Sequence, residues 1–161
     1  MIDLDVRGAA AGIDEMVRRR LVRRLRRAMV AAGVGGAEVS LSLVDDGEIH
    51  ALNRSYLGED HATDVLSFSQ REGEAPALPA GAAELLGDIV ISTETAARQA
   101  ATRGVTLDAE LLHLAVHGLA HLCGLDHATA AEEQAMFGWE AKLREQATAR
   151  GAPRPVPPPR P

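Results

Sequence analysis

Three histidines in the last third of the chain have a spacing that suits one metal ion. His117 and His121 are four residues apart in a segment expected to be helical, so both imidazoles leave one face about one turn apart. That separation lets two neutral imidazole nitrogens reach one ion at ~2.0–2.1 Å. Gly124 stands where a helix can end in a left-handed turn, which would bring His127 back as a third ligand. Three imidazoles leave one coordination position open, as is typical of a catalytic zinc.

Other nearby residues give competing assignments. His113, His117 and His121 form a rival ligand set, but His113 and His121 are ~12 Å apart along a straight helix. An ion between them would be bound almost linearly, which tetrahedral zinc disfavours, so His113 is interpreted as a wall or outer residue. Cys123 points about 200° from His121 and is interpreted as a small buried hydrophobe. Asp126 either orients an imidazole or caps the next helix, and the sequence leaves both roles open.

The same spacing occurs in the zinc protease motif HExxHxxGxxH. Gly118 stands where that motif has the glutamate that acts as general base. A peptidase of this type would therefore lack its proton acceptor. The pattern keeps the metal geometry and argues against a metalloprotease.

The elements expected to position these residues have an α+β pattern. Alternating apolar residues predict strands, and helical periodicity between capping residues and glycines predicts helices. The predicted strands are 2–6, 39–43, 65–68 and 89–91, and the predicted helices are 14–32, 45–58, 93–103, 107–123 and 129–147. A long loop is expected from 70 to 84. The order predicts a single domain in which about five helices pack against a four-stranded sheet.

Composition limits the classes of protein that fit. The 46% hydrophobic and 25% charged fractions are those of a soluble globular chain, and no apolar stretch reaches the ~18–20 residues of a membrane span. The single cysteine argues against a disulfide framework. With a net charge of −6, the overall field does not attract nucleic acid. We expect a cytoplasmic domain at 1–148, followed by a disordered Pro/Arg-rich tail at 149–161, where six of the eight prolines fall in the last nine residues.

The first predicted helix carries seven arginines between Arg18 and Arg27. On a helical projection, one face holds Arg19, Arg20, Arg23, Arg26 and Arg27. The face is either a solvated amphipathic surface or a patch that binds phosphates, since five guanidiniums set up a strong local positive field. Screening confines that field to ~8–10 Å, so the acidic total charge does not oppose it.

Residues 117–127 read HGLAHLCGLDH and resemble the HGxLHLxGYDH signature of the YbeY endoribonucleases, also described as rRNA maturation factors, with Ala120 and Leu125 as departures. Residues 53–68 are similar to the family's NxxYxxxDxPTDVLSF stretch, with Ala62 in the proline position. Residues 86–92 and 110–114 resemble its GDIxIS strand and the approach to its metal helix. The resemblance covers roughly residues 38–140.

The resemblance implies a zinc-dependent single-strand endoribonuclease that acts in ribosomal RNA maturation, at the small-subunit 3′ end, and in ribosome quality control. It implies one Zn²⁺ per chain, held by His117, His121 and His127, and ribosomal RNA and the small subunit or its associated factors as partners, with no membrane. Many members have an arginine directly after the tyrosine, where this chain has Leu57. Either Arg54, the candidate catalytic residue, or an arginine of the first helix then supplies the positive charge, or the contact with phosphate is weaker in this chain. Two other functions remain: another metallohydrolase of phosphate esters, or a non-catalytic ribosome-associated metal-binding protein.

Overall fold

The structure, a computed structural model, describes residues 1–70 and 83–160. The described residues form four strands, five α-helices and one short 3-10 helix. Strands and helices alternate as far as the third strand, which is followed by the fourth strand and then by three consecutive helices. The elements are β1 (Ile2–Val6), η1 (Gly8–Gly12), α1 (Glu15–Ala31), β2 (Glu38–Val44), α2 (Asp46–Leu57), β3 (Val65–Ser69), β4 (Leu85–Ser92), α3 (Thr93–Arg103), α4 (Leu107–Leu122) and α5 (Ala130–Thr148).

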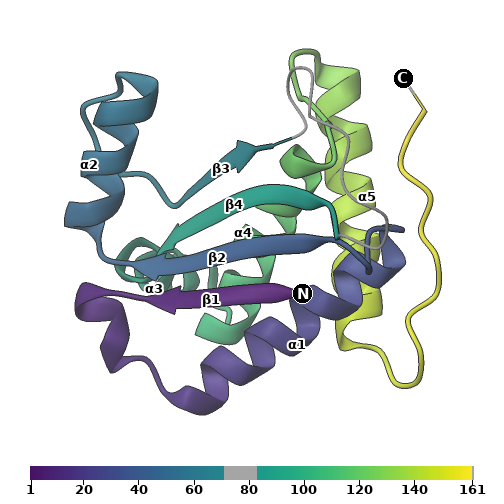
Figure 1. Ribbon diagram of the computed structural model, residues 1–161, viewed down its shortest axis with the longest axis horizontal. Helices are drawn as coiled ribbons and strands as arrows, with labels where there is room; N and C mark the ends of the chain where they lie inside the picture. The colour runs from purple at the N-terminus through teal and green to yellow at the C-terminus, as the bar shows by residue number, and fades with distance from the viewer. Residues whose placement is uncertain (71–82, 161) are drawn as a thin grey trace.

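The sheet has the strand order β1-β2-β4-β3 (Figure 1). β1, β2 and β4 are parallel, with Leu4 opposite Leu41 and Leu41 opposite Ile89. β3 runs antiparallel to β4, with Ser67 opposite Ile89, and forms one edge of the sheet. Among the described residues β3 is thus an edge strand, and α4 contacts it.

The main core lies between one face of the sheet and helices α1, α4 and α5. Leu41, Leu43 and Ile89 point from the sheet into this core and are fully buried. A smaller apolar cluster on the opposite face joins Val90 and Leu66 to Ile49 of α2. The two clusters follow from the two-residue alternation of the strands, which sends successive side chains to opposite faces.

Helix α4 approaches β4 unusually closely at Gly118. A Cβ atom at this buried position would lie 2.9 Å from Cγ2 and 3.2 Å from Cγ1 of Ile89. Real Cβ atoms essentially never come within 3.0 Å of a neighbour, so a larger residue would require the buried Ile89 side chain, the helix or the strand to shift. The glycine that occupies the general-base position of the protease motif therefore has a packing role in this fold.

The proline-rich segment after α5 packs against the domain. It runs as extended chain beside α1 and α5 (Figure 1). The Val156 N–H donates to the carbonyl of Ala31 at 2.8 Å, and Trp139 Nε1 donates to the carbonyl of Val156 at 2.9 Å. The Arg27 guanidinium donates to four carbonyls near the end of α5, those of Gln146, Ala147, Ala149 and Gly151. These contacts hold residues 149–156 in place.

The predicted fold class is confirmed: the chain has a four-stranded sheet with helices packed against it. Two features differ from the sequence prediction. The tail expected to be disordered from 149 is bound to α1 and α5, because its backbone carbonyls meet unpaired side-chain donors there. The short helix η1 was not expected. Most of the loop predicted at 70–84 lies outside the described residues. No helix in the described part of the chain is long and apolar enough to cross a bilayer.

Replacing Arg27 by alanine tests the binding of the proline-rich segment. The change removes every hydrogen bond from this guanidinium to the last carbonyls of α5, so the free energy of unfolding should fall by about 1–3 kcal/mol. Arg26→Ala is the matched control, because its exposed side chain has no partner among the described residues, and should change stability by less than about 0.5 kcal/mol. Urea unfolding measures both. Equal effects of the two variants would contradict the role given to Arg27.

A pair of glycine substitutions tests the close approach of α4 to β4. Gly118→Ala should destabilise the protein by about 1–3 kcal/mol, because the new methyl group meets Ile89 in a packed core. Gly138→Ala, in exposed space within α5, should stabilise it by about 0.5–1 kcal/mol through helix propensity. Thermal unfolding of the two variants gives opposite signs if the packing is as described.

Candidate metal centre

The imidazoles of His117, His121 and His127 converge beside the end of α4. One nitrogen from each ring lies within 4.8 Å of the others. The Nε2 atoms of His117 and His121 are 3.2 Å apart, close to the ~3.3 Å expected for two nitrogens each ~2.0–2.1 Å from one tetrahedral ion. The ring centroids of His121 and His127 are 5.2 Å apart. The donor set and its spacing fit a single zinc-like cation.

The turn after α4 brings His127 to the other two rings. Gly124 has φ of 91°, a left-handed conformation that glycine adopts without strain. The Leu125 N–H donates to the carbonyl of Ala120 at 3.1 Å, so the chain folds back over the helix end. Asp126 accepts a hydrogen bond from the His127 backbone N–H at 2.7 Å. Asp126 thus fixes the turn, and the capping residue of α5 is Thr129.

Glu140 on α5 orients the His117 ring through a hydrogen bond to its Nδ1 atom. Its Oε1 lies 2.6 Å from His117 Nδ1, and the glutamate side chain is 1% exposed. A carboxylate accepts hydrogen bonds and does not donate, so Nδ1 carries the proton and Nε2 presents its lone pair to the other rings. A carboxylate behind a metal-binding imidazole also raises the basicity of that ligand.

The surroundings of His117 and His121 shift the pKa values of these two side chains in opposite directions. The hydrogen bond to Glu140 raises the pKa of His117, and this effect outweighs the burial that opposes it. Burial lowers the pKa of His121, helped by the neighbouring His117 and His127 rings. A neutral His121 offers a free lone pair, which is the form that a metal binds.

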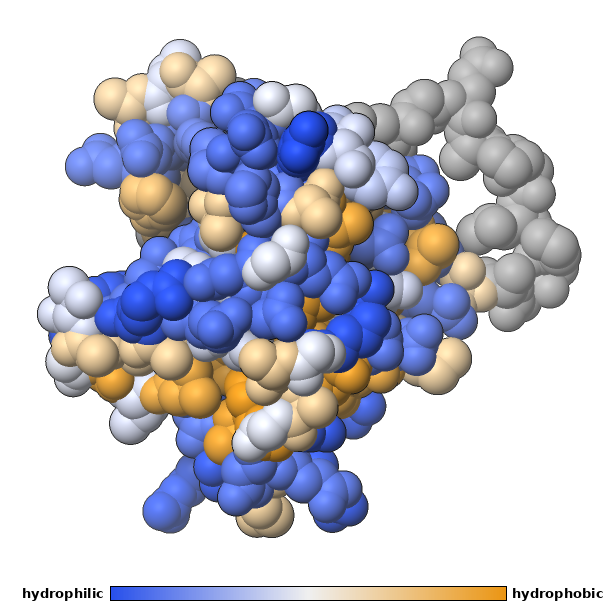
Figure 2. Space-filling view, turned by 90° about the vertical axis from the view of Figure 1, so that its left-hand side faces the viewer, coloured by the Kyte–Doolittle hydropathy of each residue, from blue (hydrophilic) through white to orange (hydrophobic). Residues whose placement is uncertain are grey.

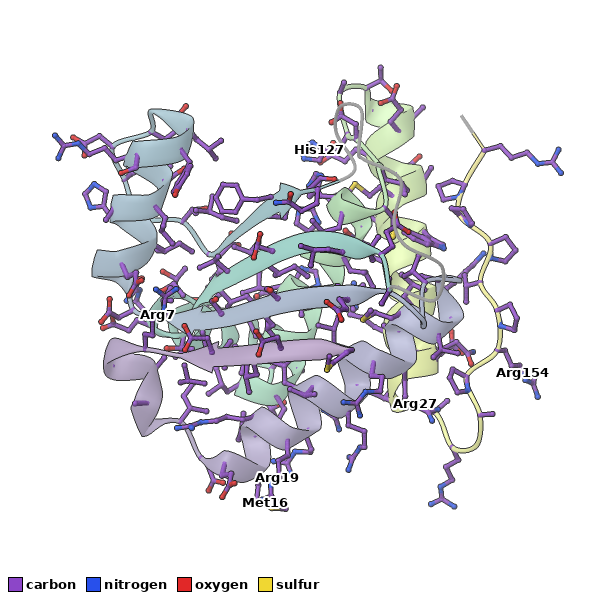
Figure 3. The ribbon with its side chains drawn as sticks, in the orientation of Figure 1. Arg7, Met16, Arg19, Arg27, His127 and Arg154 are labelled. Carbon is purple, nitrogen blue, oxygen red and sulfur yellow. The ribbon has the colours of Figure 1, made fainter. Side chains whose placement is uncertain are left out.

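His117 and His121 form part of one wall of a groove of about 560 Å³ between α4 and β3. In Figure 3, His127 lies beside the end of β3, on the side of the molecule away from α1. The β3 residues Val65, Ser67 and Ser69 line the groove opposite His117 and His121. Apart from histidine, no basic residue of the described chain lines it. Among the described residues, an anionic substrate in this groove therefore meets the metal site but no arginine.

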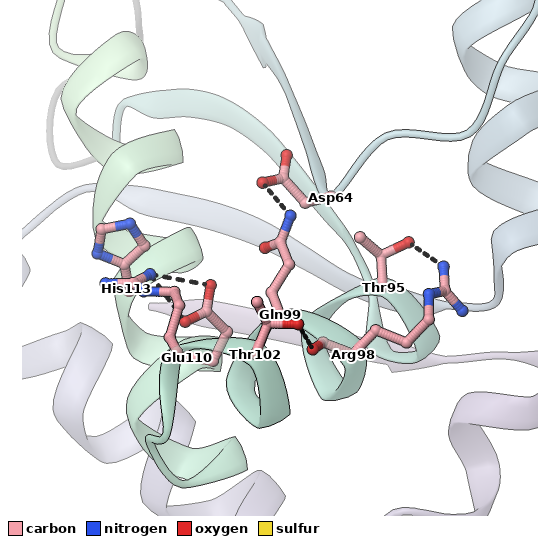
Figure 4. Close-up of a pocket in the computed structure, with 8 residues that line it drawn as sticks. Asp64, Thr95, Arg98, Gln99, Thr102, Glu110 and His113 are labelled. Atoms are coloured by element: carbon pink, nitrogen blue, oxygen red, sulfur yellow. Dashed lines mark hydrogen bonds and ion pairs between the residues drawn. The ribbon is translucent and has the colours of Figure 1, made fainter.

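The other predicted residues lie around the groove or outside it. Arg54 is exposed in the last turn of α2 and does not line the groove, whereas Leu57 does. His113 lies one turn before His117, in a neighbouring pocket of about 420 Å³ that also contains Asp64 and Gln99 (Figure 4). Gln99 Nε2 donates to Asp64 Oδ2 at 3.3 Å in that pocket, and Asp64 also lines the metal groove. Cys123 packs against the core and is not in the metal cluster.

Glu140 was missed in the sequence, although a signal was present. The buried side of α5 is formed by Met136, Trp139, Leu143 and Ala147, and Glu140 falls on the same face. An acidic residue at a core position is rarely left without a partner. The periodicity of α5 therefore indicated a buried carboxylate that needs a partner, but not which histidine it would meet.

Comparisons with known proteins agree with the geometry. The family model described as Endoribonuclease YbeY matches residues 7–148. The Endoribonuclease YbeY of Moorella thermoacetica is 55% identical over 116 residues, which cover 69% of this chain and 74% of that protein. The Endoribonuclease YbeY of Thermus thermophilus is 50% identical over 132 residues, covering 80% and 88%. A solution structure of TM1509 from Thermotoga maritima is similar, with a TM-score of 0.58 and 26% identity, covering 91% of this chain and 89% of that one.

Replacing Glu140 by glutamine tests its role behind His117. The amide keeps the size of the side chain but is a weaker acceptor, so the affinity for Zn²⁺ should fall about 10–100-fold. Glu145→Gln, an exposed change on the same helix, should leave the affinity unchanged. Competition with a chromophoric chelator measures both dissociation constants. An unchanged affinity in the Glu140 variant would show that this hydrogen bond does not support metal binding.

Proposed function

The chain belongs to the YbeY endoribonuclease family, and from that membership we propose that it is a zinc-dependent endoribonuclease acting on single-stranded ribosomal RNA. The observation that carries the proposal is the convergence of three imidazoles, two of which line a groove beside the edge strand β3. His117, His121 and His127 would hold one Zn²⁺. The proposed substrate is the 3′ end of small-subunit rRNA, with a further role in ribosome quality control. The proposed partners are the small subunit or its associated factors, in the cytoplasm.

A bound divalent ion would supply Lewis acidity and lower the pKa of a coordinated water toward neutrality. The residues of the chain serve to hold and shape that site. Glu140 keeps the proton of His117 on Nδ1, and the turn at Gly124 holds His127 beside the helix. Ser67 and Ser69 of β3 line the opposite wall of the groove. A single RNA strand lying between β3 and α4 would pass directly over the histidines.

Besides the histidines, Asp64 and Asp126 are the only titratable groups among the described residues that line the groove. Asp126 is engaged with the backbone of His127, and Asp64 accepts hydrogen bonds from Gln99 and from the Val65 N–H. Arg54 remains our candidate for the catalytic arginine, although it lies outside the groove lining and would have to approach with the substrate bound.

Histidine substitutions test the function and the ligand set together. His121→Ala should lose both Zn²⁺, measured by elemental analysis, and cleavage of a labelled single-stranded RNA, because one of three ligands is gone. His113→Ala is the matched control on the same helix and should retain bound zinc. Retained cleavage by metal-free protein would end the proposal. Cleavage of small phosphate esters but not of RNA would favour another metallohydrolase. Loss of zinc in the His113 variant would favour the rival ligand set.

A further inference from the structure

Exposed arginines gather on α1 and on the proline-rich segment that packs beside it. We name as the basic surface the exposed residues Arg19, Arg23, Arg26, Arg150, Arg154 and Arg160. Arg19 and Arg154 lie toward the lower and right-hand sides of Figure 3, with Arg27 between them. In Figure 2, hydrophilic side chains project at the lower end of the view, the end at which α1 lies in Figure 1. The bound segment therefore adds its arginines to those of the helix.

Most of these charges have no counter-charge. Among the described residues, the side chains of Arg23, Arg26 and Arg154 make no hydrogen bond or ion pair. Only Arg19 is paired, with Glu15 at 3.0 Å. Arg20 is held by Asp108 and Arg27 by backbone carbonyls, so these two are occupied and do not belong to the basic surface. The structure thus separates the arginines that stabilise the fold from those that are free to bind a partner.

The arrangement of the free arginines carries an energetic cost. Arg19 and Arg23 are four residues apart on α1, and Arg23 and Arg26 are three apart, so like charges face each other along one ridge. Such pairs destabilise a helix by a few tenths of a kcal/mol each. The ridge borders a shallow groove of about 420 Å³ that Leu4 and Val22 line beside the edge strand β1. A polyanion lying along the ridge would relieve the repulsion, whereas the net charge of −6 makes the rest of the surface repel it.

The α1 part of this surface lies on the side of the molecule away from the metal centre. β1 and β3 are opposite edges of the sheet, about 14 Å apart at the usual strand spacing; α1 lies on the β1 side and His127 beside the end of β3 (Figures 1 and 3). The proline-rich segment starts near the end of α5 and runs along that helix toward the end of the molecule that holds His127 (Figure 1). The metal groove itself has no arginine among its described lining residues. Among the described residues, cationic side chains other than histidine that could contact a substrate therefore lie outside the groove.

We propose that the basic surface formed by α1 and the bound proline-rich segment binds the phosphate backbone of the RNA substrate at a distance from the metal centre. The proposal rests on the proposed function for the identity of the substrate. Binding there would be independent of sequence and sensitive to salt, because it comes from guanidinium–phosphate contacts and counterion release. It would favour long or structured RNA over short oligonucleotides, which cannot reach both sites.

The test combines three substitutions in one variant, Arg23→Gln, Arg26→Gln and Arg154→Gln. These side chains have no partners in the described structure, so the fold should be retained, as urea unfolding would verify. Fluorescence anisotropy with an RNA of about 30 nucleotides should show roughly 50-fold weaker binding at about 0.15 M salt, near fourfold per lost contact. The slope of log K against log salt should become shallower by about 2. Arg7→Gln is a control for one lost charge, because Arg7 is already paired with Asp5 and Glu48.

Binding and cleavage separate this proposal from the nuclease assignment. For cleavage, kcat/KM on the long RNA relative to that on an oligonucleotide of about four nucleotides should fall by a similar factor in the triple variant. RNA binding that depends on the three arginines in a protein without cleavage would sustain the surface and reject the nuclease. Unchanged binding and an unchanged salt slope would overturn the surface. So would equally strong, arginine-dependent binding to vesicles of anionic lipid, which would identify a membrane partner instead.

Discussion

The contact between Gly118 and Ile89 sets the position of everything around the metal centre. Because Gly118 has no side chain of its own, α4 rests directly on the Ile89 side chain of β4. His117 and His121 flank the face that makes this contact, so their rings are directed along the sheet toward the open edge of β3. A helix held farther from the sheet would widen the groove and move both imidazoles away from the strand that faces them. The packing of α4 against β4 in the core therefore also sets the width of the groove.

Buried carboxylates on α4 and α5 form the ion pairs and hydrogen bonds that surround the metal centre within the helical layer. Glu140 and Glu110 are each 1% exposed, the first paired with His117 and the second with Arg103. Glu140 Oε2 and Arg144 Nη1 are buried without hydrogen-bond partners among the described residues, four positions apart on α5. Burial lowers the pKa of Arg144. A carboxylate placed in such surroundings is a strong acceptor for an imidazole proton, and losing one partner would leave the other charge unpaired.

Much of this organisation could be predicted from the sequence because it depends on local rules. Alternation identified the strands, and the capping residues Asp14, Asp45, Thr106 and Thr129 marked helix starts that the structure reproduces. The turn at Gly124 followed from the need for a positive φ. Contacts between distant segments could not be predicted in the same way. Glu140 meets His117 across 23 positions, and Arg27 meets α5 across about 120, and neither spacing leaves a periodic signal. The same reason explains why the proline-rich segment was expected to be disordered: its composition indicates an extended conformation but does not show that it packs against α1 and α5.

The hydrogen bonds that Arg27 and Ala31 make with the C-terminal part of the chain affect the order in which the protein acquires its structure during synthesis. The carbonyls that receive Arg27 lie at positions 146–151, and the Val156 N–H that meets Ala31 lies later still. When α1 leaves the ribosome, its C-terminal end has none of these partners. Translation must continue for more than a hundred residues before they exist. Until then, the apolar face of α1 cannot pack against α5. The first helix of the chain therefore makes some of its contacts last.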